Sequence, residues 1–184
     1  MPDSETMRGI GITQLGDPRL RVAAEPYRLP AEATLARGQL VRLLVSMRRV
    51  SEVHVFSKGM GLAAPQIGIG RAAAVVRPGE RGVAATVLFN PSVVDASRET
   101  DEQYEGCLSF FDVRGLVPRS LWIDVRHTSL TGRSTVTRFE NGLARLVAHE
   151  IDHLDGIVYT DRMRPGIRPI DVTEYHGTGS AWSY

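Results

Sequence analysis

Residues 147–156 read Val-Ala-His-Glu-Ile-Asp-His-Leu-Asp-Gly, and the rest of the chain is organised around this stretch. His149 and His153 are four residues apart, so on a helix both imidazoles face the same side and can bind one metal ion. Glu150 projects beside that face, where its carboxylate can reach a water on the metal without displacing it. The pattern also arises by chance, and a solvated helix face that carries His and Glu is an equal alternative.

The residues around this motif have the pattern of an amphipathic helix. Apolar side chains recur at steps of three and four: Leu143, Leu146, Val147, Leu154. Asn141 can cap the start through its side chain, and Gly156 can end the helix in a left-handed conformation. We therefore predict a helix over residues 141–155.

Composition bounds the class of protein. A chain of 184 residues with 42% hydrophobic and 23% charged residues suits one globular domain, or one domain with a tail. The net charge of +1 argues against nucleic acid as an obligate partner. No apolar run is long enough to cross a bilayer, and the polar N-terminus lacks the layout of a secretory signal. With a single cysteine, no internal disulfide can form, and we expect a cytoplasmic protein without a membrane partner.

The remaining pattern predicts an α+β fold. A second helix is expected over residues 31–51, in the N-terminal half of the chain. Short strand-like runs occur at residues 72–76, 83–89, 121–125 and 134–139, with turns at 79–82 and 131–133. Strands without helices between them favour antiparallel pairing. We expect short antiparallel sheets packed around a central helix that carries the His-Glu-x-x-His motif.

We expect one domain over residues 1–161, in which residues 1–8 form a mobile leader. Residues 162–184 are rich in Pro and Gly and predict an extended tail. Tyr175, Trp182 and Tyr184 suggest that this tail lies against the body of the protein.

A catalytic metal site usually has three protein ligands and one open position, so the two histidines need a partner. The candidate is Cys107, because a thiolate binds divalent metals strongly and Gly106 lets its loop come close. The alternative is a buried cysteine in the core. Residues 59–68 are rich in Gly and small side chains, which suits either close approach of another backbone or an ordinary turn.

Three stretches together resemble the signature motifs of one family. Residues 61–66 read Gly-Leu-Ala-Ala-Pro-Gln, residues 105–109 read Glu-Gly-Cys-Leu-Ser, and residues 149–153 read His-Glu-Ile-Asp-His. In this order they strongly resemble the three motifs of peptide deformylases, and the resemblance covers residues 11–161. It implies an α+β metallohydrolase that removes the formyl group from the formylmethionine of new polypeptides and releases formate.

The resemblance also implies roles in the reaction. Cys107, His149 and His153 would hold one divalent metal, usually Fe²⁺ in this family, with Zn²⁺, Ni²⁺ or Co²⁺ possible. Glu150 would take a proton from a water on the metal and deliver it to the leaving amine. The side-chain amide of Gln66 and the N–H of Leu108 would stabilise the oxyanion.

A substrate site is implied beside the metal. An extended peptide would pair with the backbone at Gly59 and Gly61. The wall of the methionine pocket would include Met60, Phe110, Leu146 and His149. Arg114 matches a family position near the pocket mouth, and a surface arginine is the alternative.

Other polar residues are expected to support the site or to lie on the surface. Glu105 would orient a loop or a ligand, with Arg119 as its partner. Asp152 and Asp155 would support the helix. The histidines at positions 54, 127 and 176 match no motif and are expected on the surface.

The sequence departs from the family where Phe110-Phe111-Asp112 replaces the usual Val-Pro after the cysteine motif. This favours, as an alternative function, a related metalloamidase or formyl-hydrolase with an altered pocket in specialised metabolism. A merely metal-binding module is disfavoured, because it needs neither Glu150 nor Gln66. We expect a monomer that acts on N-formylmethionyl nascent peptides. The chain lacks the helical tail of many bacterial members, so ribosome docking through such a helix is not expected.

Overall fold

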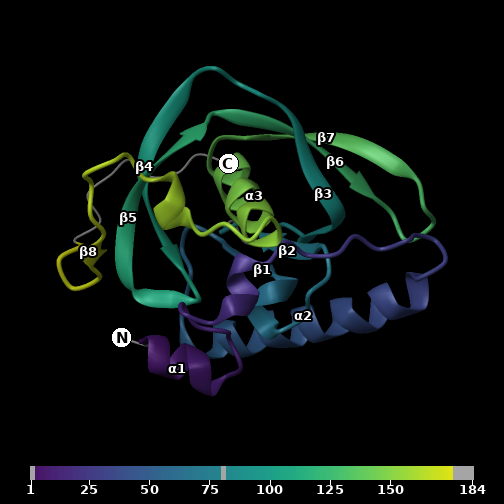
Figure 1. Ribbon diagram of the computed structural model, residues 1–184, viewed down its shortest axis with the longest axis horizontal. Coiled ribbons are helices and arrows are strands. Elements are labelled where there is room, and N and C mark those ends of the chain that lie inside the picture. Colours follow the sequence, from purple (N-terminus) through teal and green to yellow (C-terminus); the bar gives the residue numbers. More distant parts are fainter. Residues whose placement is uncertain (1–2, 80–81, 176–184) are drawn as a thin grey trace.

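Two antiparallel sheets frame the protein, and a computed structural model describes residues 3–79 and 82–175 (Figure 1). The larger sheet has the strand order β1-β2-β3-β6-β7. Its strands are β1 (Met60–Ala63), β2 (Ala73–Arg77), β3 (Thr86–Ala96), β6 (Trp122–Thr128) and β7 (Ser134–Glu140). The smaller sheet has the order β4-β5-β8. It consists of β4 (Thr100–Cys107), β5 (Phe110–Ser120) and β8 (Ile170–Asp171). The expected α+β class with antiparallel sheets is confirmed.

The helices occupy three places in the fold. They are α1 (Ser4–Gly9), α2 (Ala33–Val53) and α3 (Asn141–Leu154), and three short 3₁₀ turns accompany them: η1 (Pro18–Arg21), η2 (Ala64–Ile67) and η3 (Tyr159–Arg162). In Figure 1, α3 lies between the β4–β5 hairpin and the larger sheet, and α2 runs along the lower edge of the view. Helix α3 contacts β1, β2 and β7, and also β5 of the smaller sheet.

Helices α2 and α3 cover opposite faces of the larger sheet because neighbouring side chains on a strand point to opposite sides. On β2, Val75 packs into an apolar cluster with Leu43 of α2. The next residue, Val76, packs into a second cluster with Val147 of α3. Strand β2 is therefore buried on both faces, and α3 is fixed against a rigid sheet.

Helix α3 begins and ends close to the predicted positions, but its start is not capped as we expected. Glu140 occupies the N-cap position and its side chain makes no capping hydrogen bond. Asn141 has φ of 51°, so the prediction that its side chain caps the helix is wrong. At the other end, Gly156 has φ of 74° and ends the helix in the left-handed region, as predicted.

The expectation of a mobile leader is wrong for residues 4–8. These residues belong to α1, and Met7 is fully buried in the core cluster that also holds Ile12. Met7 is a single buried apolar residue among polar neighbours, so the sequence shows no apolar pattern that would indicate this helix. Two long strands, β4 and β5, were also not predicted, and β3 starts later and runs further than residues 83–89.

Some sequence predictions fall outside the described residues. These are the centre of the turn at 79–82, His176, and the aromatic residues Trp182 and Tyr184. Within residues 3–79 and 82–175, no helix combines the length and the hydropathy that crossing a membrane requires.

Candidate active site

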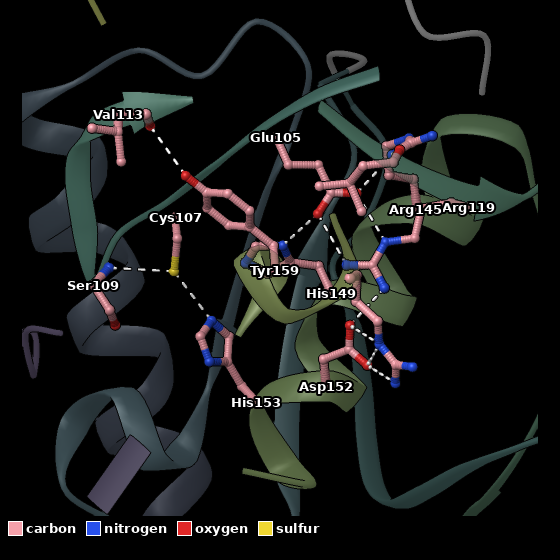
Figure 2. Close-up of polar contacts among 12 residues, drawn as sticks. Glu105, Cys107, Ser109, Val113, Arg119, Arg145, His149, Asp152, His153 and Tyr159 are labelled. Atoms are coloured by element: carbon pink, nitrogen blue, oxygen red, sulfur yellow. Dashed lines mark hydrogen bonds and ion pairs between the residues drawn. The ribbon is translucent and has the colours of Figure 1, made fainter. Parts of the chain in front are cut away.

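Three potential metal ligands converge where β4 ends beside α3 (Figure 2). Cys107 is the last residue of β4, and His149 and His153 lie one turn apart on α3. One ligand atom from each, a sulfur and two imidazole nitrogens, lie within 4.8 Å of one another, and all three residues are buried. Cys107 Sγ is 3.1 Å from His153 Nε2. A thiolate with two imidazoles suits zinc, iron and similar divalent ions, so these residues fit the metal that the sequence implies.

The electrostatic field at these ligands also favours a cation. Burial alone would lower the pKa of His149, but hydrogen bonds with Cys107 and Glu105 hold that pKa well above its usual value. Glu105 lies 2.9 Å from His149 Nδ1. Groups that hold a proton on His149 this strongly would also attract a divalent ion, which would compete with that proton for the ring.

Glu105 is the centre of a buried ion-pair network, which Figure 2 shows above α3. Arg119 donates to both of its carboxylate oxygens, at 2.9 and 3.0 Å, and Arg145 donates to one of them at 2.7 Å. Burial raises the pKa of Glu105, but the charge of Arg119 and the hydrogen bond from His149 outweigh it and hold that pKa below its usual range. The ionised carboxylate therefore accepts the Nδ1–H of His149, so Nε2 is the ring nitrogen that can bind a metal once its proton is displaced. The expected pairing of Glu105 with Arg119 is observed.

Asp152 extends the same network to η3. Its carboxylate accepts hydrogen bonds from Arg119 at 2.6 Å and from Arg162 at 2.7 Å. These bonds connect α3 with β5 and with η3. The expectation that Asp152 supports the helix agrees with this arrangement.

Glu150 is buried next to the ligands without being one of them. Burial raises its pKa to about 7, against an ordinary value of 4.5. Its Oε2 has no hydrogen-bond partner within the described parts of the chain. Strand β1 passes close to this side chain at Gly61, where a Cβ would lie 2.6 Å from Glu150 Cγ. A carboxylate with one unengaged oxygen and a pKa near neutrality suits proton transfer to and from a water.

Gln66 and Leu108 both lie close to the candidate ligand Cys107. Gln66 lies in η2, and its Oε1 accepts from the N–H of Ala63 at 2.9 Å. This bond directs Nε2 toward Ser109 Oγ, at 3.2 Å, and Cys107 Sγ, at 3.5 Å. Leu108 is the first residue of the two-residue turn between β4 and β5. Both residues therefore lie beside the candidate metal ligands.

A cavity of about 260 Å³ opens beside these groups. Its walls include five of the expected substrate-binding residues, which come from the β1 region, β5 and α3: Gly59, Met60, Gly61, Arg114, Leu146. Gln66, Cys107, His149 and Glu150 also line it. The cavity therefore connects the candidate metal centre with the face of β1, which is where an extended peptide was expected.

Phe110 lies outside this cavity, contrary to our expectation. Its ring stacks on Tyr159 with centroids 4.6 Å apart, in an apolar cluster that includes Cys107. Phe111 lines the cavity instead. The reason is the strand pleat of β5, which points consecutive side chains to opposite faces. The Arg114 guanidinium lies 5.0 Å from the Phe111 ring centroid and covers that wall.

Several other residues in the cavity wall were not predicted from the sequence. His54, expected on the surface, lines the cavity, and its ring centroid is 5.1 Å from that of Phe111. Tyr104 and Tyr175 form another part of the wall, with ring centroids 5.3 Å apart. Tyr175 had been expected to lie against the body, which it does. His127 lies outside the cavity lining and contacts Thr137 at 2.9 Å.

Comparison with known proteins identifies the family. A family model described as polypeptide deformylase matches residues 10–168. The chain belongs to the polypeptide deformylase family. The matched residues include all three motifs and every candidate ligand.

Relatives cover most of the chain. A peptide deformylase of Roseiflexus sp. (strain RS-1) is 40% identical over 159 residues, which are 79% of this chain and 81% of the relative. The crystal structure of peptide deformylase from Thermotoga maritima matches with a TM-score of 0.71 and 32% identity, covering 84% of this chain and 97% of that one. A Met-Ala-Ser-bound class I type b peptide deformylase from Acinetobacter baumannii matches with a TM-score of 0.70 and 30% identity, covering 83% and 96%. Enzymes of this family are metallohydrolases that remove the N-terminal formyl group of nascent peptides.

Proposed function

We propose that this chain hydrolyses the N-terminal formyl group of formylmethionyl peptides at the centre formed by Cys107, His149 and His153. The observation that carries the proposal is the convergence of one thiol and two imidazoles beside a buried, unengaged Glu150 carboxylate. Family membership supports the reaction, and the proximity of these four residues supports the roles proposed for them. Helix α3, which carries three of these four residues, is the element around which the site is organised.

The metal is proposed to be Fe²⁺, with Zn²⁺, Ni²⁺ or Co²⁺ as substitutes. Cys107 Sγ and one ring nitrogen from each histidine would hold it, and Glu105 would keep the His149 ring in the orientation that this requires. When bound, such an ion lowers the pKa of a water by several units and polarises a carbonyl oxygen.

Glu150 is proposed to move the proton. Its Oε2 would accept a proton from the attacking water and later deliver that proton to the leaving amine of methionine. A pKa of about 7 in the metal-free site lets one carboxylate do both near neutral pH. Burial also excludes bulk water, which would otherwise compete as proton acceptor.

Gln66 Nε2 and the N–H of Leu108 are proposed to stabilise the oxyanion that develops from the formyl oxygen. Gln66 is buried, and its bond with the N–H of Ala63 directs Nε2 toward the candidate ligand Cys107, where the formyl oxygen would compete for its N–H groups. Removal of one such donor costs roughly 10²- to 10³-fold in kcat at comparable sites.

The substrate peptide is proposed to run along β1 beside Gly59 and Gly61, where the absence of side chains permits close approach. Met60, Leu146 and Phe111 offer apolar surface for the methionine side chain, so Phe111 takes the role first expected of Phe110. The relative whose structure contains Met-Ala-Ser supports this class of ligand.

We also propose that residues 1–161 act as one catalytic domain, with residues 162–184 as a tail that contributes Tyr175 to the cavity. A monomer is expected, because the ligands and the base all come from one chain. The substrate implies the cytoplasm as the compartment.

The alternative function is hydrolysis of another formylated or acylated amide. The aromatic wall formed by His54, Phe56 and Phe111 favours it, because these rings narrow the space beside the apolar pocket. It uses the same metal centre and the same base, so only the choice of substrate separates the two functions.

The test is formate release by protein that is purified anaerobically with iron or nickel. We expect rapid release from formyl-Met-Ala-Ser, little acetate from acetyl-Met-Ala-Ser, and no turnover by Glu150→Ala protein that retains its metal. Failure on formyl-Met-Ala-Ser with turnover of a different formylated or acetylated amide would favour the alternative. An active Glu150→Ala variant would exclude Glu150 as the base.

A further inference from the structure

Residues 12–15, which lie between α1 and η1, contact both segments that carry the oxyanion donors. The N–H of Thr13 donates to the carbonyl oxygen of Gln66 at 2.7 Å. The N–H of Leu15 donates to the carbonyl oxygen of Ser109, also at 2.7 Å. Segment 12–15 therefore connects η2 with the β4–β5 turn and sets the distance between them.

The side chain of Gln14 adds a further hydrogen bond between segment 12–15 and the β4–β5 turn. Its Nε2 donates to the carbonyl oxygen of Leu108 at 3.2 Å and to that of Ile12 at 3.0 Å. Both neighbours are carbonyl oxygens, so the amide nitrogen must face them. Gln14 is buried, and its Oε1 has no hydrogen-bond partner among residues 3–79 and 82–175. The side chain is thus engaged through its donor end, which contacts the turn.

These bonds immobilise the turn that presents the N–H of Leu108. The peptide unit between Leu108 and Ser109 is held at its oxygen by Gln14 and at its N–H by Cys107 Sγ, 3.4 Å away. The following carbonyl is held by Leu15. Because both its oxygen and its N–H are hydrogen-bonded, the Leu108–Ser109 peptide has little freedom to rotate. This restricts the direction in which the N–H of Leu108 points.

Segment 12–15 is itself anchored through α1. Met7 and Ile12 are buried in the core, and the N–H of Ile12 donates to the carbonyl of Met7 at 3.0 Å. The Oγ of Ser4 accepts from the N–H of Phe111 at 2.9 Å, directly after the turn. The N-terminal residues are therefore positioned to brace the β4–β5 turn.

We propose that Gln14 is a positioning residue for oxyanion stabilisation, which keeps the N–H of Leu108 aligned with the amide of Gln66. The inference rests on the proposed function. A purely structural Gln14 would only contribute to stability, so the test must separate alignment of the donors from loss of fold.

The experiment compares Gln14→Met, which keeps length but removes the amide donor, with Gln39→Met as a control. Gln39 is a partly buried glutamine that accepts a hydrogen bond from Tyr27, away from the cavity. Formate release from formyl-Met-Ala-Ser, metal per chain, Tm and the Kd of Met-Ala-Ser are measured for both. Met-Ala-Ser has no formyl oxygen, so its affinity does not report on the oxyanion donors.

We expect kcat of Gln14→Met to fall by about 10- to 100-fold, since misalignment of a donor should cost up to what its removal costs. The KM, the metal content and the Kd of Met-Ala-Ser should stay within about twofold of the parent values, and Gln39→Met should keep its kcat. Amide hydrogen exchange at Ser109, measured by NMR, should accelerate in Gln14→Met and not in the control.

An unchanged kcat with unchanged exchange at Ser109 would overturn the inference. A fall in kcat that is fully explained by loss of metal, or by weaker binding of Met-Ala-Ser, would also overturn the inference. If the parent protein releases no formate, the proposed function fails. The exchange measurement then decides separately whether Gln14 holds the turn.

Discussion

Replacing Glu105 with Gln removes one negative charge from the buried network but keeps the size of the side chain. Arg119 loses an ionised partner that it contacts twice, and Arg145 loses a contact of 2.7 Å. The side chains of these two arginines are only 8% and 2% exposed, so water cannot replace the lost carboxylate. His149 also loses the charged acceptor of its Nδ1–H.

The expected loss of stability depends on the ion pairs that the two arginines keep after the substitution. Breaking a buried ion pair typically costs about 3–5 kcal/mol, because one charge stays buried without compensation. Arg119 retains Asp152, and Arg145 retains Asp101, so we expect the lower end of this range, about 3 kcal/mol. For a chain of this size that corresponds to a Tm lower by about 6–12 °C. Metal affinity should fall by roughly 10- to 100-fold as the ring of His149 loses its orientation.

The assay is calorimetry of the metal-free protein together with competition against a chelator for metal affinity. Asp124→Asn is the matched control, because Arg138 contacts Asp124 twice at 2.8 Å but lies on the surface. This control should keep a Tm and a metal affinity close to those of the parent. If Glu105→Gln is as stable as the control and its metal affinity is unchanged, then Glu105 neither stabilises the fold nor supports metal binding through His149.

Three further predictions concern the base and the thiolate. Burial raises the pKa of Glu150 to about 7 in the metal-free fold, so its ionisation destabilises that fold increasingly between pH 4.5 and about 7. Metal-free Glu150→Gln should therefore have a higher Tm than the parent at pH 8 and a similar Tm at pH 4.5. A higher Tm of the variant at low pH only would contradict this. In Gly61→Ala, the new Cβ would displace the Glu150 side chain, so kcat for formate release should fall by about 100-fold while metal content is retained. Full activity of this variant would show that the Glu150 side chain tolerates displacement. The iron-loaded enzyme should lose activity in air faster than under nitrogen as Cys107 and the metal oxidise, and equal lifetimes would speak against thiolate ligation.

The parts of the fold that the sequence predicted are those with a regular period. Helices α2 and α3 carry apolar residues at steps of three and four, and β2 and β6 are short apolar runs. Strands β4 and β5 lack such a signal, because their pairing contributes polar side chains to the buried network. Glu105 and Arg119 read as surface residues from their type alone, yet they are buried because they neutralise each other.

The candidate site was predictable only where side-chain chemistry is specific. His149, Glu150 and His153 share one helix, so their spacing suffices to bring them together. Cys107 lies 42 residues before His149, and nothing local indicates that β4 ends beside α3; the family resemblance supplied that link. Phe110 was placed in the pocket because the pleat of an unpredicted strand could not be followed. Gln14 carries no motif, and its role depends on contacts 94 residues away in sequence.

The most direct test of the metal centre is the metal content and formate release of Cys107→Ala protein, prepared anaerobically beside the parent. We expect the parent to bind one iron or nickel per chain and to release formate from formyl-Met-Ala-Ser. The variant should lose both the metal and the activity while it keeps its fold, as judged by circular dichroism. A folded Cys107→Ala variant that retains the metal and full activity would contradict the assignment of Cys107, His149 and His153 as the catalytic metal centre.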